Sequence, residues 1–428
     1  MDSVFGKHKT SKSAFKDIIS SMPEDVITNI LNRLPIQYAV TTSTLSRNWR
    51  FKWTSLSHVV LDKEFFDFLR GLGVENWYSE MIISQILHHL KGSITKFDLF
   101  IPYDKVLDVN TIDHWLMLLS KKGIKELKLI NMYQEPLRLS SNLFSCVKLE
   151  RLTLGECSIF SAQTTVCGFP NLLHLDLDCV EFVKEIFGEI ITQCPLLECL
   201  QVGRRFPWDP SGKVKIDEIA KLKNLKCLWL PLCLLDNITI TSSLVFHLVD
   251  HFSKLQVLYL DLSVCEFLGE SSARDRVGTS SFSCLSTLKL DSIDSGNDDM
   301  LSFAFDMIWG SPKLHTLKIT SAYAVPPPAS SALKHISTRQ LKHLRIVEFK
   351  DFGGSESEIN MIKNILACSP MLNKIDIYLC SVTMYFGDNY ELMFATKLLP
   401  KLHRASSAAQ MNIIDRSDEY DVLLNSNI

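Results

Sequence analysis

Residues 149–154 read Leu-Glu-Arg-Leu-Thr-Leu, in which one leucine precedes a pair of leucines spaced two residues apart. Side chains two residues apart point to the same face of a β-strand, and the residue between them points to the opposite face. The hexapeptide therefore predicts a short strand with one apolar and one polar face. Similar hexapeptides occupy residues 124–129, 172–177, 197–202, 225–230, 255–260, 285–290 and 314–319.

The spacing of these hexapeptides indicates a repeat. The first residue of each apolar pair falls at positions 127, 152, 175, 200, 228, 258, 288 and 317, in steps of 23 to 30 residues. This period is typical of irregular leucine-rich repeats. One unit cannot bury its leucines alone, whereas stacked neighbours can, at about 1.5–3 kcal/mol per leucine. We expect an α/β fold, a curved solenoid with a parallel sheet on its concave face.

The repeat extends beyond these hexapeptides. Residues 59–61 and 97–99 predict two earlier strands, and residues 182–194 and 243–252 predict return helices with apolar faces. Residues 269–283 and 291–299 are rich in serine, glycine and charge, which favours surface loops.

The N-terminal part predicts three short helices. The first begins at Pro23 and ends before Pro35, and its apolar residues recur at helical spacing. The second covers about residues 37–43, and a third from Ser46 onward would place Trp49 and Trp53 on one side. A module of about forty residues leaves much of its apolar surface uncovered, which favours a docking surface. The alternative is that this surface packs on the domain that follows.

This module resembles the F-box, through Met22-Pro23, Leu34-Pro35 and residues 46–53, which read Ser-Arg-Asn-Trp-Arg-Phe-Lys-Trp. The resemblance implies a contact with a Skp-family adaptor and, through it, with the cullin of an SCF-type ubiquitin ligase. The residues to which it assigns that contact are Pro23, Ile30, Leu31, Leu34, Pro35 and Trp49.

The C-terminal part begins after three prolines at residues 326–328, which suggest a stiff connection. Beyond them, residues 341–354 predict a strand and a glycine turn, residues 357–367 a helix, and residues 372–378 a strand. This region, with residues 398–407, resembles the FBD region of plant F-box/FBD/leucine-rich-repeat proteins. We expect a tail (1–16), an F-box (17–56), a solenoid (57–325), a linker (326–340), an FBD cap (341–410) and a second tail (411–428).

The composition of the chain disfavours several classes of protein. The chain is 46% hydrophobic and 22% charged, as ordered proteins are, and its net charge of −3 disfavours nucleic-acid binding. No apolar run is long enough for a membrane span, and residues 1–16 lack the apolar core of a secretory signal. The twelve cysteines are scattered without a CxxC pair, so we expect reduced thiols and a cytoplasmic or nuclear location.

Catalytic and metal motifs are absent from the sequence. It contains no G-x-S-x-G elbow, P-loop or Rossmann glycine pattern. His247 and His251 are four residues apart, but no glutamate completes an H-E-x-x-H motif. We expect a non-catalytic protein without a metal or cofactor.

The polar faces of the strands are better candidates for function. Trp229 and Tyr259 occupy equivalent positions in adjacent hexapeptides, so they should be neighbours on the concave face. Aromatic side chains on a polar surface are common interface anchors. We expect a target-binding patch formed by Trp229, Tyr259, Asp176, Asp261, Lys289 and Asp291. The alternative is that residues 204–212, which include Trp208, cover these rings.

These expectations favour a substrate-recognition adaptor of a ubiquitin ligase, which binds an unknown target protein. One alternative is an interaction scaffold that acts without ubiquitin transfer. Another is a small-molecule receptor, which would need a basic pocket that the concave residues, mixed in sign, do not supply.

Overall fold

The structure is a computed structural model of the chain. It describes residues 19–74, 78–160, 168–182, 186–203, 214–235, 239–241, 243, 245–246, 249, 251–263, 266–268, 282–322, 340–380 and 390–415. The expected first tail, the prolines at 326–328, His247 and the segment 204–212 lie outside these residues, as do part of the expected helix 243–252 and most of the loop 269–283.

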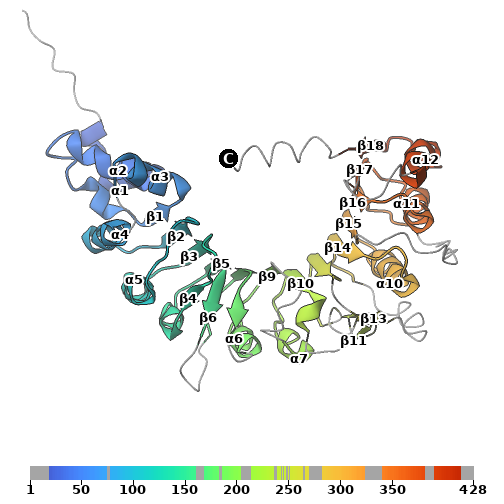
Figure 1. The fold of residues 1–428 in the computed structure, drawn as a ribbon, viewed down its shortest axis with the longest axis horizontal. Coiled ribbons are helices and arrows are strands. Elements are labelled where there is room, and N and C mark those ends of the chain that lie inside the picture. The colour runs from blue at the N-terminus through green and yellow to red at the C-terminus, as the bar shows by residue number, and fades with distance from the viewer. Residues whose placement is uncertain are drawn as a thin grey trace, which may run out of the picture.

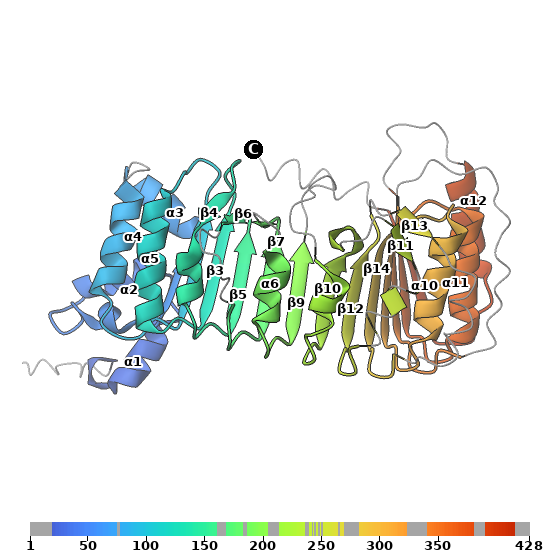
Figure 2. The same cartoon turned by 90° about the horizontal axis from the view of Figure 1, so that it is seen from below.

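The leucine pairs form the expected strands, and these lie side by side in one parallel sheet (Figure 2). Neighbouring repeats pair in register, as Leu175 does with Leu200, so the leucines stack in continuous buried rows. The main sheet contains β1 (His58–Leu61), β2 (Lys96–Ile101), β3 (Glu126–Asn131), β5 (Arg151–Gly155), β7 (His174–Asp178), β9 (Cys199–Gly203), β10 (Cys227–Pro231), β12 (Val257–Asp261), β14 (Thr287–Ile293), β15 (Thr316–Ser321), β16 (Ile346–Phe352), β17 (Lys374–Leu379) and β18 (Gln410–Ile414).

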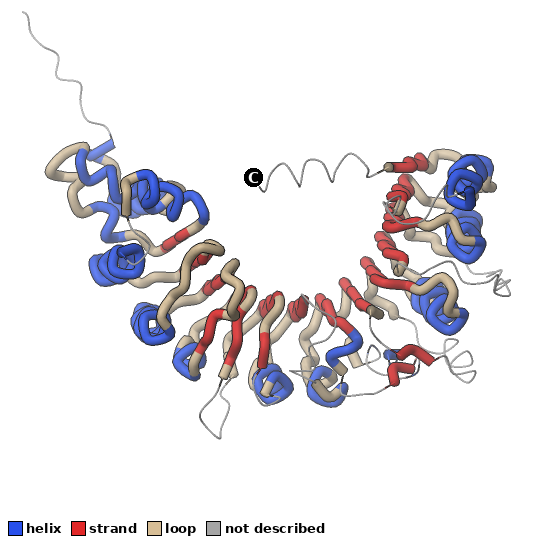
Figure 3. The backbone as a smooth tube through the Cα atoms, in the orientation of Figure 1, coloured by secondary structure: helices blue, strands red, loops and turns tan. Residues whose placement is uncertain are grey.

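The molecule is an arc with the main sheet on its inner side and helices on its outer side (Figures 1 and 3). The leucines point outward toward the helices, which cover them, and the residues between the leucines face the concave side. The helices are α1 (Glu24–Leu31), α2 (Ile36–Thr41), α3 (Lys63–Gly71), α4 (Tyr78–His89), α5 (Val109–Lys122), α6 (Phe187–Thr192), α7 (Ile216–Ile219), α10 (Asp298–Trp309), α11 (Glu356–Cys368) and α12 (Tyr390–Leu398).

Short elements complete the connections between strands and helices. Two small parallel sheets are formed by β4 (Leu137–Leu139), β6 (Cys157–Ile159) and β8 (Glu181–Phe182), and by β11 (Thr239–Thr241) and β13 (Glu266–Leu268). The 3-10 helices are η1 (Ile19–Ser21), η2 (Thr42–Thr44), η3 (Lys52–Ser55), η4 (Ser141–Ser145), η6 (Leu232–Leu234) and η7 (Leu399–Lys401). Within the described ranges, no helix is long and apolar enough to cross a bilayer.

Three expectations about local structure were wrong. The third N-terminal helix is replaced by turns and by η3, so Trp49 and Trp53 do not share a helix face. Residues 291–299 are not one loop, because β14 extends to Ile293 and α10 begins at Asp298. Residues 411–414, expected in a tail, belong to β18, which pairs with β17.

Candidate interaction surfaces

Helix α1 has a buried side and an exposed side. Ile27 and Leu31 are 1% and 0% exposed and join the hydrophobic core. Val26, Ile30 and Leu34 are 38–40% exposed and recur every four residues, so they form one row along the helix and the turn after it. We call these three residues the α1 row. The row is an apolar surface available to a partner.

The six residues expected to contact the adaptor are divided between the surface and the core. Ile30, Leu34 and Pro23 are exposed, and Pro35 is half-buried. Leu31 is fully buried and Trp49 is only 7% exposed, so both shape the module from within. Trp49 belongs to the same cluster of buried side chains as Ile27 and Leu31, and this packing keeps its indole away from the surface.

A polar contact joins α1 to the first strand of the sheet. The Asn32 side chain accepts hydrogen bonds from the backbone N–H groups of Ser57 and His58, at 3.1 and 3.2 Å. Its Nδ2 donates to Ser57 Oγ at 3.1 Å. Three bonds from one residue fix the helix against β1. The sequence does not predict this role of Asn32, because no local pattern shows that residues 25 positions apart meet.

The two expected aromatic neighbours on the concave face do meet. Trp229 on β10 pairs in register with Tyr259 on β12, and their rings lie edge to face with centroids 5.0 Å apart. Such a pair contributes about 0.5–1.5 kcal/mol beyond the area it buries. The two rings form the centre of a surface that we call the concave patch, with Asp176, Asp261, Lys289 and Asp291.

Tyr259 is held by the next strand, β14. Its hydroxyl donates to Asp291 Oδ2 at 2.5 Å, and Lys289 Nζ lies 4.1 Å from the ring centroid. Burial and the bond to Asp291 raise the pKa of Tyr259, so the phenol stays protonated at neutral pH. Lys289 also lies 3.7 Å from Asp291. The aromatic pair is therefore preorganised.

The other two carboxylates of the patch form no ion pair within 4 Å among the described residues, although the charge of Lys128 acts on Asp176. Asp176 is half-buried, and burial together with the charge of Asp178 raises its pKa. Asp261 accepts a hydrogen bond from the backbone N–H of Ser263 at 2.8 Å. The centre of the concave face therefore contains two carboxyl groups, Asp176 and Asp261, without a direct ion pair in the described part of the chain.

Toward both ends of the arc, the concave charges pair with one another. Glu348 on β16 binds Lys318 at 2.8 Å and Lys350 at 2.9 Å, and both contacts lower its pKa against the opposing effect of burial. Further pairs are Lys96–Asp98, Arg151–Glu126 and Lys374–Asp376. Asp176 and Asp261, near the centre of the face, form no such ion pairs among the described residues.

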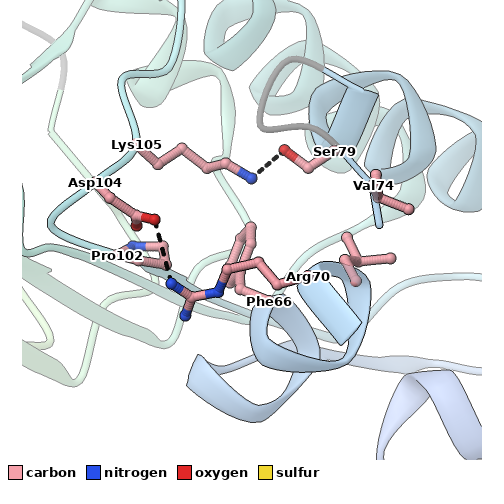
Figure 4. A pocket seen from close by; sticks show the side chains of 8 residues that line it. Phe66, Arg70, Val74, Ser79, Pro102, Asp104 and Lys105 are labelled. Atoms are coloured by element: carbon pink, nitrogen blue, oxygen red, sulfur yellow. Dashed lines mark hydrogen bonds and ion pairs between the residues drawn. The ribbon is translucent and has the colours of Figure 1, made fainter. Parts of the chain in front are cut away.

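One small pocket lies between α3, α4 and the segment after β2 (Figure 4). Lys105 enters it, donates to Ser79 Oγ, and places Nζ 4.5 Å from the centroid of the Phe66 ring. Burial lowers the pKa of Lys105. Arg70 at the rim binds Asp104 at 3.2 Å. Because the polar groups satisfy one another, the pocket serves to join these elements.

Metal ligands do not gather anywhere in the described part of the chain, since no group of three histidine, cysteine or acidic side chains is placed to hold an ion. This finding does not extend to His247, which lies outside the described residues.

Comparison with known families gives three matches along the chain. The F-box domain matches residues 19–60, the leucine-rich repeats of the FBD-associated F-box protein At5g56370 match residues 112–247, and the FBD matches residues 340–377. The F-box/FBD/LRR-repeat protein At1g13570 of Arabidopsis thaliana is 26% identical over 84% of this chain and 91% of that protein. The chain thus carries matches to the F-box, the leucine-rich repeats and the FBD in that order, and it is similar to F-box/FBD/leucine-rich-repeat proteins.

Other relatives match this chain over shorter stretches. The FBD-associated F-box protein At5g56370 of Arabidopsis thaliana is 31% identical over 44% of each chain, so the match spans less than half of that relative. Among solved structures, a chain of the yeast Rad7 and Elc1 complex has a TM-score of 0.38 at 12% identity, over 93% of this chain and 94% of that chain. A score this low supports no argument about the protein.

The family matches correspond to recognisable parts of the fold. The F-box match covers α1, α2 and the turns up to β1, and therefore contains the α1 row. The FBD match covers β16 and α11 and reaches into β17. The segment that matches the FBD thus continues the main sheet and forms no separate layer. The concave patch lies between these two parts, on strands of the repeat.

Proposed function

We propose that this protein is the substrate-recognition subunit of an SCF-type cullin-RING ubiquitin ligase. The α1 row binds a Skp-family adaptor, and the concave patch binds a target protein. The chain itself supplies no catalytic group in this proposal. It contributes proximity, because it holds the target near the ubiquitin-charged enzyme that another subunit recruits.

The exposure of the α1 row supports the first contact. The alternative was that the apolar stripe of α1 packs wholly on the domain that follows. Only half of the stripe does so, through Ile27 and Leu31, while Ile30 and Leu34 remain 40% exposed. An apolar row of this kind on a small helical module is typical of a docking surface.

The composition of the concave patch supports the second contact. Trp229 and Tyr259 provide rigid aromatic area that is already ordered before binding. The carboxyl groups of Asp176 and Asp261, which form no direct ion pair among the described residues, favour a target that presents lysine or arginine side chains to the rings. We infer that the target binds through a positively charged segment, and that its association weakens with salt.

Co-expression with a Skp-family adaptor tests the first contact. The double variant Ile30→Glu/Leu34→Glu removes the α1 row, and Leu72→Glu is the matched control, since Leu72 is a 64% exposed leucine outside the F-box. Each buried apolar side chain contributes about 1.5–3 kcal/mol, so the double variant should bind at least about 100-fold more weakly. The control should bind as the unmodified chain does. Leu31→Ala and Trp49→Ala are unsuitable here, because both residues belong to the core.

Whether the adaptor complex also binds cullin then distinguishes a ligase subunit from an interaction scaffold. Size-exclusion chromatography of the adaptor complex with added cullin should give one co-eluting assembly. If the adaptor binds while cullin does not, the scaffold interpretation replaces the ligase. If a folded chain binds no adaptor at all, the F-box surface has another partner and the proposal fails.

A further inference from the structure

Three side chains lie in a row across adjacent strands of the concave face. His174 on β7 pairs in register with Cys199 on β9, and Cys199 pairs in register with Cys227 on β10. Neighbouring strands lie about 4.7–4.9 Å apart. This spacing is within the Cα separation of about 4.4–6.8 Å that disulfides require. The two thiols are therefore placed to react with each other.

The sulfur of Cys199 receives hydrogen bonds. Gln201, which is two residues further along the same face of β9, donates from Nε2 to Cys199 Sγ at 3.6 Å. The hydrogen bond from the Cys227 thiol lowers the pKa of Cys199 to about 6, and His174 and Gln201 act in the same direction against burial. Cys227, as the donor, has its pKa raised. The thiolate, which is the nucleophilic form, is thus favoured at Cys199.

Other cysteines lack this arrangement. Cys179 is also half-buried, but its thiol donates to Asp178 Oδ1 at 3.4 Å, and burial and that carboxylate raise its pKa. Cys146, Cys157 and Cys194 are buried, which raises their pKa to about 12, 12 and 11. Among the described thiols, Cys199 therefore combines partial exposure, donors on its sulfur and a second thiol in register.

We propose that Cys199 is a peroxide-reactive thiol and that Cys227 is its resolving partner, so that a hydroperoxide converts this pair to a disulfide between β9 and β10. The proposal does not depend on the ligase function. It concerns a modification site on the same face as the concave patch, since Cys227 is two residues from Trp229.

The chemistry balances with the peroxide as the two-electron oxidant. The Cys199 thiolate attacks one peroxide oxygen, an S–O bond forms, the O–O bond breaks, and the departing oxygen takes a proton and leaves as water or an alcohol. Cys227 then loses its proton and attacks the sulfenic sulfur, the S–S bond forms, and the S–O bond breaks to release water. Metal binding is a poorer fit, because His174 and the two thiols do not form a group placed to hold an ion, and no other such group exists in the described part of the chain.

Mass spectrometry of the full-length protein tests the proposal. One to two equivalents of hydrogen peroxide at pH 7, followed by blocking of free thiols and tryptic digestion, should give a cross-linked peptide pair that is absent without peroxide. Trypsin can separate the two cysteines because Lys226 immediately precedes Cys227. Both Cys199→Ser and Cys227→Ser should abolish this cross-link, and Cys179→Ser should not.

A sulfenic-acid probe assigns the two roles. In Cys227→Ser, dimedone should label Cys199 at least tenfold faster than it labels Cys179. The proposal is overturned if no cross-link forms in the unmodified protein, if the cross-link persists in Cys199→Ser, or if Cys179 is labelled as fast as Cys199. Circular dichroism of each variant confirms that the substitution leaves the fold intact.

Discussion

At the scale of single residues, Tyr259 shows how the concave patch is ordered before any partner binds. Three groups on the two neighbouring strands restrain its ring and hydroxyl: Trp229 on β10, and Lys289 and Asp291 on β14. An ordered aromatic side chain loses little conformational freedom when a partner arrives. The patch is therefore a surface whose binding energy should be concentrated in its two rings.

Tyr259→Phe keeps the ring and removes only the hydroxyl. Loss of the hydrogen bond to Asp291 should lower the free energy of unfolding by about 1–2 kcal/mol, because the acceptor is a carboxylate. Urea unfolding monitored by circular dichroism measures the change. Tyr259→Phe/Asp291→Asn tests coupling, since the two substitutions should be less than additive. Full additivity would show that the 2.5 Å contact contributes nothing to stability.

Asp176 should make stability depend on pH. Its folded-state pKa is raised by burial and by Asp178, so the folded chain binds this proton more tightly than the unfolded chain does. The favourable contribution of the protonated form is therefore present below about pH 4 and is lost as the pH rises through the folded-state pKa. Asp176→Asn should raise the free energy of unfolding at pH 7, and the gain should shrink toward pH 4. A gain that is equal at both pH values would exclude this origin.

At the scale of elements, the strands follow from the sequence more directly than the helices do. The Leu-x-Leu pattern predicted the repeat strands because a two-residue period is local and recurs in eight hexapeptides. The prediction of a third N-terminal helix was wrong, because tertiary packing of Trp49 overrides a weak local preference for helix.

The start of α11 was predicted at residue 357, which overlooked a capping signal that the sequence contains. Ser355 and Glu358 have the S-x-x-E spacing of a capping box, and the structure contains that box.

The capping box at the start of α11 should contribute measurably to stability. Ser355 Oγ accepts from the Glu358 backbone N–H at 3.3 Å, and Glu358, 4% exposed, accepts from Ser321 Oγ at 2.5 Å. Ser355→Ala should cost about 1 kcal/mol in the free energy of unfolding. Glu358→Ala should cost more, because it leaves buried donors unsatisfied.

Ser357→Ala is the matched control for this helix start, because Ser357 lies in the same first turn outside the capping box. It should change the free energy of unfolding by less than about 0.5 kcal/mol. Urea titrations of the three variants decide the order. Equal effects of Ser355→Ala and Ser357→Ala would mean that the box adds nothing.

At the scale of the whole molecule, one hydrophobic core extends from the F-box to the C-terminal cap. Ile27 and Leu31 of α1 belong to the same cluster of buried side chains as Ile377 of β17. The buried cluster therefore runs along the arc of Figure 1, beneath both the α1 row and the concave patch. The sequence predicted the order of these parts and the register of Trp229 with Tyr259. It could not predict which side of α1 is exposed or which concave charges are paired, since both depend on contacts between residues far apart in the chain.

Asn32 tests how firmly the F-box is held on the solenoid. Asn32→Ala removes two bonds to the backbone of β1 and one to Ser57 Oγ, and should lower the free energy of unfolding by about 1–3 kcal/mol. Asn32→Asp keeps both acceptor contacts and loses only the Nδ2 donor, so its effect should be smaller. Hydrogen exchange should show faster exchange in α1 and β1 of Asn32→Ala, with β12 and β14 unchanged, because each repeat contacts mainly its neighbours. Uniformly faster exchange along the whole arc would show instead that the solenoid unfolds as one unit, and that the junction sets the stability of the entire molecule.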